Sequence, residues 1–225
     1  MNLTNLLTFG TPIGILLYIV YSDRFPEPLS CVLKIFFIGI LLIIPAGILN
    51  NLIIADVSQA YLAGLTEESL KFLAFLFFVS KKFQFNERMD AIVYGVIISL
   101  GFATYENYEY VYLYFPQVHS LDIALIRAFT AIPMHAMCGV IMGYHFGLRY
   151  FDNDASHLWK ALLIPIAVHA TYNSLGPILA SIVFNILVFI YIYRLHREFS
   201  SLQKSKKVES EKRTKWKAYF YQYYY

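Results

Sequence analysis

Three ionisable residues lie within one helical turn of an apolar segment. Glu67, Glu68 and Lys71 fall inside the run Ala60–Ser80. On a helix, Lys71 is at i,i+4 from the first glutamate and at i,i+3 from the second, so its ammonium group can reach either carboxylate. Because two adjacent carboxylates cannot both ionise cheaply in a low dielectric, we expect one to pair with Lys71 and the other to be available as a base. The same pattern also suits a helix end in water, where the charges would be structural.

Further ionisable side chains occur in the apolar runs that follow. Glu106 lies near the end of one run, and Arg127 and His135 lie eight residues apart in the next, on one helical face. His169 and Asn173 are one turn apart in a third run and face the same way. A single buried histidine is usually a hydrogen-bonded core residue, so neither histidine indicates a site by itself.

Taken together, these side chains have the chemistry of a hydrolase. Carboxylates and histidines can activate a water molecule, and an amide can hold a substrate carbonyl or an oxyanion. They can also ligate zinc, for example through Glu106, His135 and His169, with Glu67 as the base. The sequence contains no HExxH motif and no glycine-rich phosphate loop. Hydrolysis by activated water is therefore the best chemical fit.

The elements that position these residues are predicted to be membrane helices. Of the 225 residues, 58% are hydrophobic and only 15% are charged, against about a quarter charged in soluble domains. The apolar residues form blocks close to the length that crosses a bilayer as a helix, and the blocks have almost no polar face. We therefore predict an all-α, polytopic protein of the lipid bilayer, with no nucleic acid as a partner.

About seven spans are predicted, and the basic residues between them define an orientation. The spans are Thr8–Tyr21, Cys31–Leu52, Ala60–Ser80, Ala91–Tyr108, Ile123–Phe146, Trp159–Ser174 and Ile178–Leu195. Lys or Arg occurs in the first, third and fifth connections and after the last span, but not in the second, fourth and sixth. By the positive-inside rule, the N-terminus is outside and the C-terminus is cytoplasmic.

This topology predicts that the ionisable residues share one depth. At 1.5 Å per residue, four neighbouring helices place Glu67, Glu68, Glu106, His135 and His169 between the outer surface and about mid-bilayer. A charge near mid-bilayer costs about 3 kcal/mol, so scattered structural polar groups are not expected to gather in one slab. The shared depth favours a single, water-accessible site.

The chain is predicted to have a membrane domain at residues 1–197 and a basic, aromatic cytoplasmic tail at residues 198–225. The tail is rich in Lys and Glu and ends in a run of aromatic residues, Tyr219 to Tyr225, interrupted by Gln222. Two interpretations stay open. The tail is either solvated or docked on the anionic inner leaflet through its basic and aromatic side chains.

The combined motifs resemble those of the PrsW intramembrane proteases and, more distantly, of the CAAX-protease and bacteriocin-processing superfamily. The motifs are Glu67-Glu68-x-x-Lys71, Phe102-x-x-x-Glu106, His135 and His169-x-x-x-Asn173. The strings that begin at Asp90, Ser99 and Gly139 are similar too, and the resemblance runs from about Ile13 to Leu195. The aromatic tail is outside it.

The resemblance implies an endopeptidase of the bacterial plasma membrane. It would make the first, extracytoplasmic cut in a membrane-anchored anti-sigma factor. Glu67 would be the general base that activates water, with Glu68 paired to Lys71. Glu106, His135 and His169 would complete the site, and Asn173 would orient His169 or the oxyanion. Arg127 would bind a substrate carboxylate or pair with Glu106.

Three alternatives to this interpretation stay open: a zinc-dependent version of the same protease, a proton-coupled transporter and a non-catalytic membrane scaffold. Analogy with the wider superfamily favours a metal-free glutamate mechanism over a zinc site, although Glu106 replaces the histidine of the second superfamily motif. A proton-coupled transporter also needs buried Glu, His and Lys, but usually shows an internal repeat, and the sequence has none. A non-catalytic membrane scaffold is the third. The sequence does not define the oligomeric state.

Overall fold

All the regular secondary structure in the described residues is helical. The computed structural model describes residues 2–80, 85–114 and 120–224, and in the last helix it describes side chains as far as Ser205. The elements are α1 (Leu3–Asn5), η1 (Leu6–Gly10), α2 (Thr11–Ser22), α3 (Leu29–Leu41), α4 (Ile43–Ile53), η2 (Val57–Gln59), α5 (Leu62–Ala74), η3 (Phe75–Val79), α6 (Arg88–Tyr108), η4 (Glu109–Tyr114), α7 (Ser120–Phe129), α8 (Ala131–Phe151), α9 (Ser156–Ser174) and α10 (Ile178–Tyr224).

Each of the seven predicted spans coincides with helix, and five are long and apolar enough to cross a membrane. Within the described part of the chain these five are Leu3–Ser22, Leu29–Ile53, Arg88–Tyr114, Ser120–Phe151 and Ile178–Ser205. The other two predicted spans correspond to α5 with η3, and to α9. The first of these carries Glu67, Glu68 and Lys71, and the second carries His169 and Asn173. These polar candidate site residues make the two helices less apolar than the other five.

Helices α6 and α8 form the centre of the bundle. Residues 89–103 of α6 are all buried, as are most residues of α8. A Cβ atom at Gly95 would collide with the carbonyl oxygen of Gly139, and one at Gly143 would collide with the backbone of Ala91. The two backbones therefore meet directly, as small residues allow in membrane helices. This contact fixes the relative positions of Glu106 on α6 and His135 on α8.

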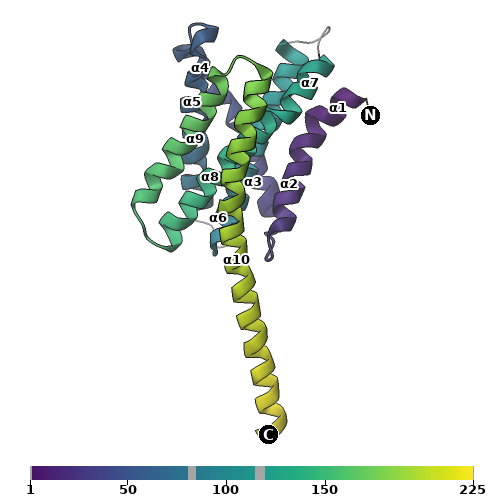
Figure 1. The fold of residues 1–225 in the computed structure, drawn as a ribbon, viewed down its shortest axis with the longest axis vertical. Coiled ribbons are helices and arrows are strands. Elements are labelled where there is room, and N and C mark those ends of the chain that lie inside the picture. The colour runs from purple at the N-terminus through teal and green to yellow at the C-terminus, as the bar shows by residue number, and fades with distance from the viewer. Residues whose placement is uncertain (1, 81–84, 115–119, 225) are drawn as a thin grey trace.

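The remaining helices surround this pair (Figure 1). α5 packs against α9 on one side, and α3 packs along α6 on the other. α10 runs along α8 and α6 and continues far beyond the bundle, so the two chain termini lie at opposite ends of the molecule. α4 packs mainly on α5, and most of its apolar side chains are exposed in the isolated chain.

The predicted run Ile123–Phe146 is broken into two helices. α7 ends at Phe129 and α8 begins at Ala131, with Thr130 in a non-helical conformation between them. The Asn185 side chain of α10 donates a hydrogen bond to the Thr130 carbonyl oxygen at 2.8 Å. The same oxygen also accepts from the Met134 backbone nitrogen at 3.1 Å, so the Asn185 bond ties α10 to the start of α8 at the break.

The first part of the predicted tail packs against the bundle. Helix α10 continues without a break through residue 198 to Tyr224. The Tyr144 hydroxyl donates to the Glu198 carboxylate at 2.8 Å, and the Phe199 and Gln203 side chains are buried. A docked helix therefore extends at least to Gln203. The terminal aromatic run lies beyond the side chains that the structure describes.

Candidate active site

The glutamate pair on α5 is divided by Lys71. The Lys71 Nζ donates to Glu68 Oε1 at 2.7 Å, whereas it lies 3.9 Å from Glu67 Oε2, beyond hydrogen-bond distance. All three side chains are buried. Lys71 also lies over the Phe102 ring, 4.2 Å from its centroid. Glu68 thus neutralises the lysine, and Glu67 has no Lys71 contact at hydrogen-bond distance.

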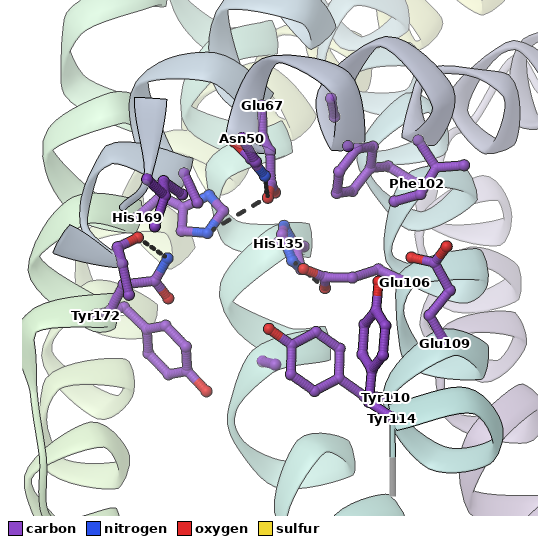
Figure 2. Close-up of a pocket in the computed structure, with 18 of the residues that line it drawn as sticks. Asn50, Glu67, Phe102, Glu106, Glu109, Tyr110, Tyr114, His135, His169 and Tyr172 are labelled. Atoms are coloured by element: carbon purple, nitrogen blue, oxygen red, sulfur yellow. Dashed lines mark hydrogen bonds and ion pairs between the residues drawn. The ribbon is translucent and has the colours of Figure 1, made fainter. Parts of the chain in front are cut away.

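His169 on α9 lies between the two glutamates. Its Nδ1 lies 3.0 Å from Glu68 Oε1, and its Nε2 lies 3.9 Å from Glu67 Oε2. A carboxylate only accepts hydrogen bonds, so the His169 proton is on Nδ1 and the lone pair on Nε2 is directed toward Glu67. Figure 2 shows the Glu67 and His169 side chains pointing toward each other.

His135 on α8 connects Lys71 to a second ion pair. Its Nδ1 accepts from Lys71 Nζ at 3.0 Å, and its Nε2 donates to Glu106 Oε2 at 3.0 Å. The same Glu106 oxygen accepts from Arg127 Nη2 at 2.5 Å. Arg127 also donates from Nε to Asn107 Oδ1 at 2.8 Å. Glu106 is therefore neutralised by Arg127 and orients the His135 ring.

Asn50 on α4 holds the remaining glutamate. Its Nδ2 donates to Glu67 Oε1 at 3.2 Å. The Thr66 hydroxyl donates to Asn50 Oδ1, which directs the amide nitrogen of Asn50 toward Glu67. Glu67 Oε2 is buried and has no hydrogen-bond partner among the described residues. One oxygen of Glu67 is thus fixed by Asn50, and the other is free to contact a water, a metal or a substrate.

A cavity of about 550 Å³ opens onto these groups (Figure 2). Glu67, Glu106, His135 and His169 line it, but Glu68 and Lys71 lie behind them. Its other walls come from α4, η2, η4, α7 and α9, and include the aromatic side chains Tyr110, Tyr114 and Tyr172. The cavity therefore combines a polar catalytic-type cluster with a large, mostly uncharged surface.

Six of the seven predicted site residues are in one connected network, and Asn173 is at its edge. The Asn173 Nδ2 donates to the Ala60 carbonyl oxygen at 3.1 Å, and the side chain lines the cavity. No hydrogen bond joins it to His169 among the described residues. Of the two roles considered for Arg127, the structure has the ion pair with Glu106.

Three side chains have the types and spacing of metal ligands. One ligand atom each from Glu67, His135 and His169 lies within 4.8 Å of the other two. His169 offers Nε2, and Glu67 offers its unpartnered Oε2. His135 would have to release Glu106 to bind through Nε2. These residues fit a divalent metal, with Glu67 as the carboxylate ligand where Glu106 was expected from the sequence.

Sequence reasoning missed Asn50, Thr66 and the tyrosines around the cavity. The only available signal for Asn50 was its position as an amide near the end of an otherwise apolar run. Thr66 had a clearer signal, because it directly precedes the glutamate pair. Tyrosines are common at membrane interfaces, so their presence near span ends did not distinguish a cavity wall from an interfacial belt.

With these helices and this cavity, the chain is a multi-pass helical membrane protein with a buried carboxylate–histidine site. Comparison with known families identifies it further. The chain belongs to the PrsW family of intramembrane metalloproteases, whose sequence pattern matches residues 27–195. This confirms the resemblance and makes the chain a peptidase, which removes the transporter and scaffold alternatives.

Curated relatives agree with this family. The chain is 34% identical to Protease PrsW of Geobacillus kaustophilus over 72% of its own length and 74% of the relative's. It is 30% identical to Protease PrsW of Bacillus subtilis, over 88% and 92%. No solved structure matches the chain. The family and the five membrane-length helices make this a multi-pass protein of the bacterial plasma membrane.

Proposed function

We propose that this protease cuts a single-span membrane protein on its extracytoplasmic side, using water activated at Glu67. An anti-sigma factor is the proposed substrate class, as the family resemblance implies. The observation that carries the catalytic proposal is the state of Glu67 Oε2. It is buried, has no hydrogen-bond partner, lines the cavity and lies 3.9 Å from the free nitrogen of His169.

The charges around the cavity support this role for Glu67. Lys71 is neutralised by Glu68, and Arg127 is neutralised by Glu106. Glu67 alone among these five has no ion pair at hydrogen-bond distance. A buried carboxylate without compensation is costly, so a group that carries positive charge or donates hydrogen bonds is expected beside Oε2. A water molecule about to lose a proton meets that requirement.

The neighbouring residues are proposed to orient the reacting groups. Glu68 fixes the tautomer of His169 and aims its Nε2 lone pair at the space beside Glu67. Glu106 accepts from His135 Nε2 and so fixes the tautomer of His135, whose ring stands perpendicular to that of His169 at a centroid distance of 4.9 Å. Asn173 donates one amide hydrogen to Ala60, and its second is available to a substrate oxyanion.

A divalent metal such as zinc is proposed to take part in this chemistry. The sequence favoured a metal-free mechanism, but the family description and the three-ligand geometry favour a metal held by Glu67, His135 and His169. When bound, such an ion would polarise the scissile carbonyl and make water more nucleophilic, and Glu67 would then be an anionic ligand of the ion in place of the free base. The basic groups do not oppose it, because Lys71 and Arg127 are each paired with a carboxylate.

We also propose the membrane topology that the sequence predicts. It has seven spans, an outer N-terminus, a protease domain at residues 1–197 and a cytoplasmic tail at residues 198–225. The location of the two termini at opposite ends of the bundle supports an odd number of crossings (Figure 1). α5 and α9 would cross as polar helices inside the bundle, where buried charges are tolerated in membrane proteins.

The first test is cleavage of a single-span substrate by purified protein in lipid nanodiscs. We expect Glu67→Gln to lower the cleavage rate by about 100- to 10,000-fold, because it removes the base or the anionic ligand. Glu109→Gln is the matched control, since Glu109 lines the same cavity without a hydrogen bond to the histidines. Undiminished cleavage by well-folded Glu67→Gln protein would overturn the assignment.

The second test measures metal. We expect active, tag-free protein to contain one transition metal ion per chain by mass spectrometry, and chelation to remove both metal and cleavage until the metal is returned. His169→Ala should lower the metal content, because an alanine supplies no ligand. Full activity in metal-free protein would establish the glutamate mechanism instead.

A further inference from the structure

A second group of buried carboxylates lies at the other end of α6. Asp23 follows α2, Glu87 is the N-cap of α6, and Asp90 is in its first turn. These side chains are 5%, 6% and 1% exposed, and one oxygen from each lies within 4.8 Å of the other two. Asp90 and Glu106 are sixteen residues apart on α6, about 24 Å along the axis, so this cluster is separate from the protease site.

The hydrogen bonds inside this acidic cluster come from neutral donors. Gln203 Nε2 on α10 donates to Asp23 Oδ1 at 2.7 Å and also to Glu87 Oε1. Asp90 Oδ2 accepts from the backbone nitrogens of Asn86 and Glu87, each at 2.8 Å. Asp23 Oδ2 is buried and has no hydrogen-bond partner among the described residues. These donors orient the carboxylates of Asp23 and Asp90 and carry no charge that would neutralise these two.

A fourth carboxylate adds to the negative charge. Glu27 accepts a hydrogen bond from the Tyr94 hydroxyl at 2.7 Å. Burial raises the pKa of Glu27, and the carboxylates of Asp23 and Glu87 raise it further, although the bond from Tyr94 opposes them. Within the described ranges, no Lys or Arg forms an ion pair with Asp23, Glu27 or Asp90. The buried carboxylates of Asp23 and Asp90 must be compensated by a cation or by protons.

We propose that Asp23, Glu87 and Asp90 bind a hard divalent cation, Mg²⁺ or Ca²⁺, as a structural site. Carboxylate oxygens are the ligands that these ions prefer, and sulfur and imidazole are missing from the described part of the cluster. The oxygen spacing fits, because ligands on opposite sides of a calcium ion are about 5 Å apart. Asp23 Oδ2 supplies an oxygen that no protein donor uses.

This cation would connect three parts of the chain. Asp23 belongs to the first connection, Glu87 and Asp90 to the start of α6, and Gln203 brings in α10 through the same carboxylates. The bound ion would fasten α10 to the bundle at the point where this helix extends beyond it. Cation binding should therefore stabilise the folded protein, since a ligand that binds only the native state shifts the unfolding equilibrium.

The test uses full-length protein in nanodiscs and the double variant Glu67→Gln/His169→Ala, which removes two of the three ligands proposed at the protease site. After EDTA treatment, Mg²⁺ or Ca²⁺ should raise the Tm of wild type and of this double variant by several degrees. Electron paramagnetic resonance should count one bound Mn²⁺ per chain in the double variant. Adding Asp23→Asn should remove both effects, whereas adding Asp154→Asn, an exposed aspartate outside the cluster, should leave them unchanged.

Two results would overturn the proposal. One is the absence of bound Mn²⁺ in the double variant with Asp23 intact, a measurement that does not require any cluster variant to fold. The other is a Tm that follows pH but no cation, which would mean that protons compensate the carboxylates. If Asp23→Asn fails to fold, Asp90→Asn provides the second substitution. The cleavage assay is independent of each result, so this site and the protease proposal fail separately.

Discussion

Asn50 is the residue that distinguishes the two oxygens of Glu67. Its amide nitrogen fixes Oε1, and its own oxygen is fixed by Thr66. Oε2 is thereby left to face His169. The helix that carries Asn50 packs mainly on α5 and also forms a wall of the cavity. A substrate segment that contacts α4 would therefore contact the helix that positions Glu67.

We expect Asn50→Ala to lower kcat by about 10- to 100-fold, because a hydrogen bond to a charged group contributes about 1.5–3 kcal/mol. KM should change little, since the lost bond is to an enzyme group and not to substrate. Asn51→Ala is the matched control, because Asn51 lines the same cavity and, among the described residues, forms no hydrogen bond with Glu67. Kinetics on both variants would check this, and equal kcat values would contradict the positioning role.

At the scale of the elements, the direct contact of α6 with α8 positions Glu106 against His135. Gly95, Gly139 and Gly143 bring the two backbones together. His135 and Glu106, one on each helix, are 3.0 Å apart as a result. Separation of these helices by one side chain would break that bond and would leave Arg127 with a partner that no longer orients His135.

Gly95→Leu should therefore destabilise the protein by about 3 kcal/mol or more, because the added side chain meets backbone atoms that cannot move away cheaply. Gly14→Leu is the matched substitution, since a Cβ at Gly14 meets nothing within 4 Å. Thermal unfolding in nanodiscs should show a large loss of Tm for the first variant and almost none for the second. Similar Tm values for the two would refute this packing argument.

For the whole molecule, the orientation in the membrane decides which side of a substrate is cut. Reporter fusions after Tyr225 and within the Val111–Leu121 connection should report opposite sides, with the second one outside. This follows from the alternation of basic residues between the spans. A third fusion in the turn at Asp152–Ala155 should agree with the C-terminal one. If the first two report the same side, both the orientation and the extracytoplasmic cut are wrong.

The helical class, the places of the apolar runs and most of the polar cluster could be predicted from the sequence. These are local properties, because the length of an apolar run and an ionisable residue inside it can be read without knowing any neighbour. The family could be recognised for the same reason, since its motifs are short and occur in order. Thus Glu67, Glu68, Lys71, His135 and His169 were all identified from their positions along the chain.

The tertiary structure determined how these groups contact one another. The spacing allowed Lys71 to reach either glutamate, the resemblance implied the pair with Glu68, and the structure has that pair, with His169 of α9 contacting the same Glu68 oxygen. Asn50 contacts Glu67, and Arg127 forms an ion pair with Glu106, because helices distant in sequence pack together at the site. The break at Thr130 and the docking of α10 at Gln203 have the same origin. Periodicity defines the face of one helix, but it does not define which faces meet or how closely.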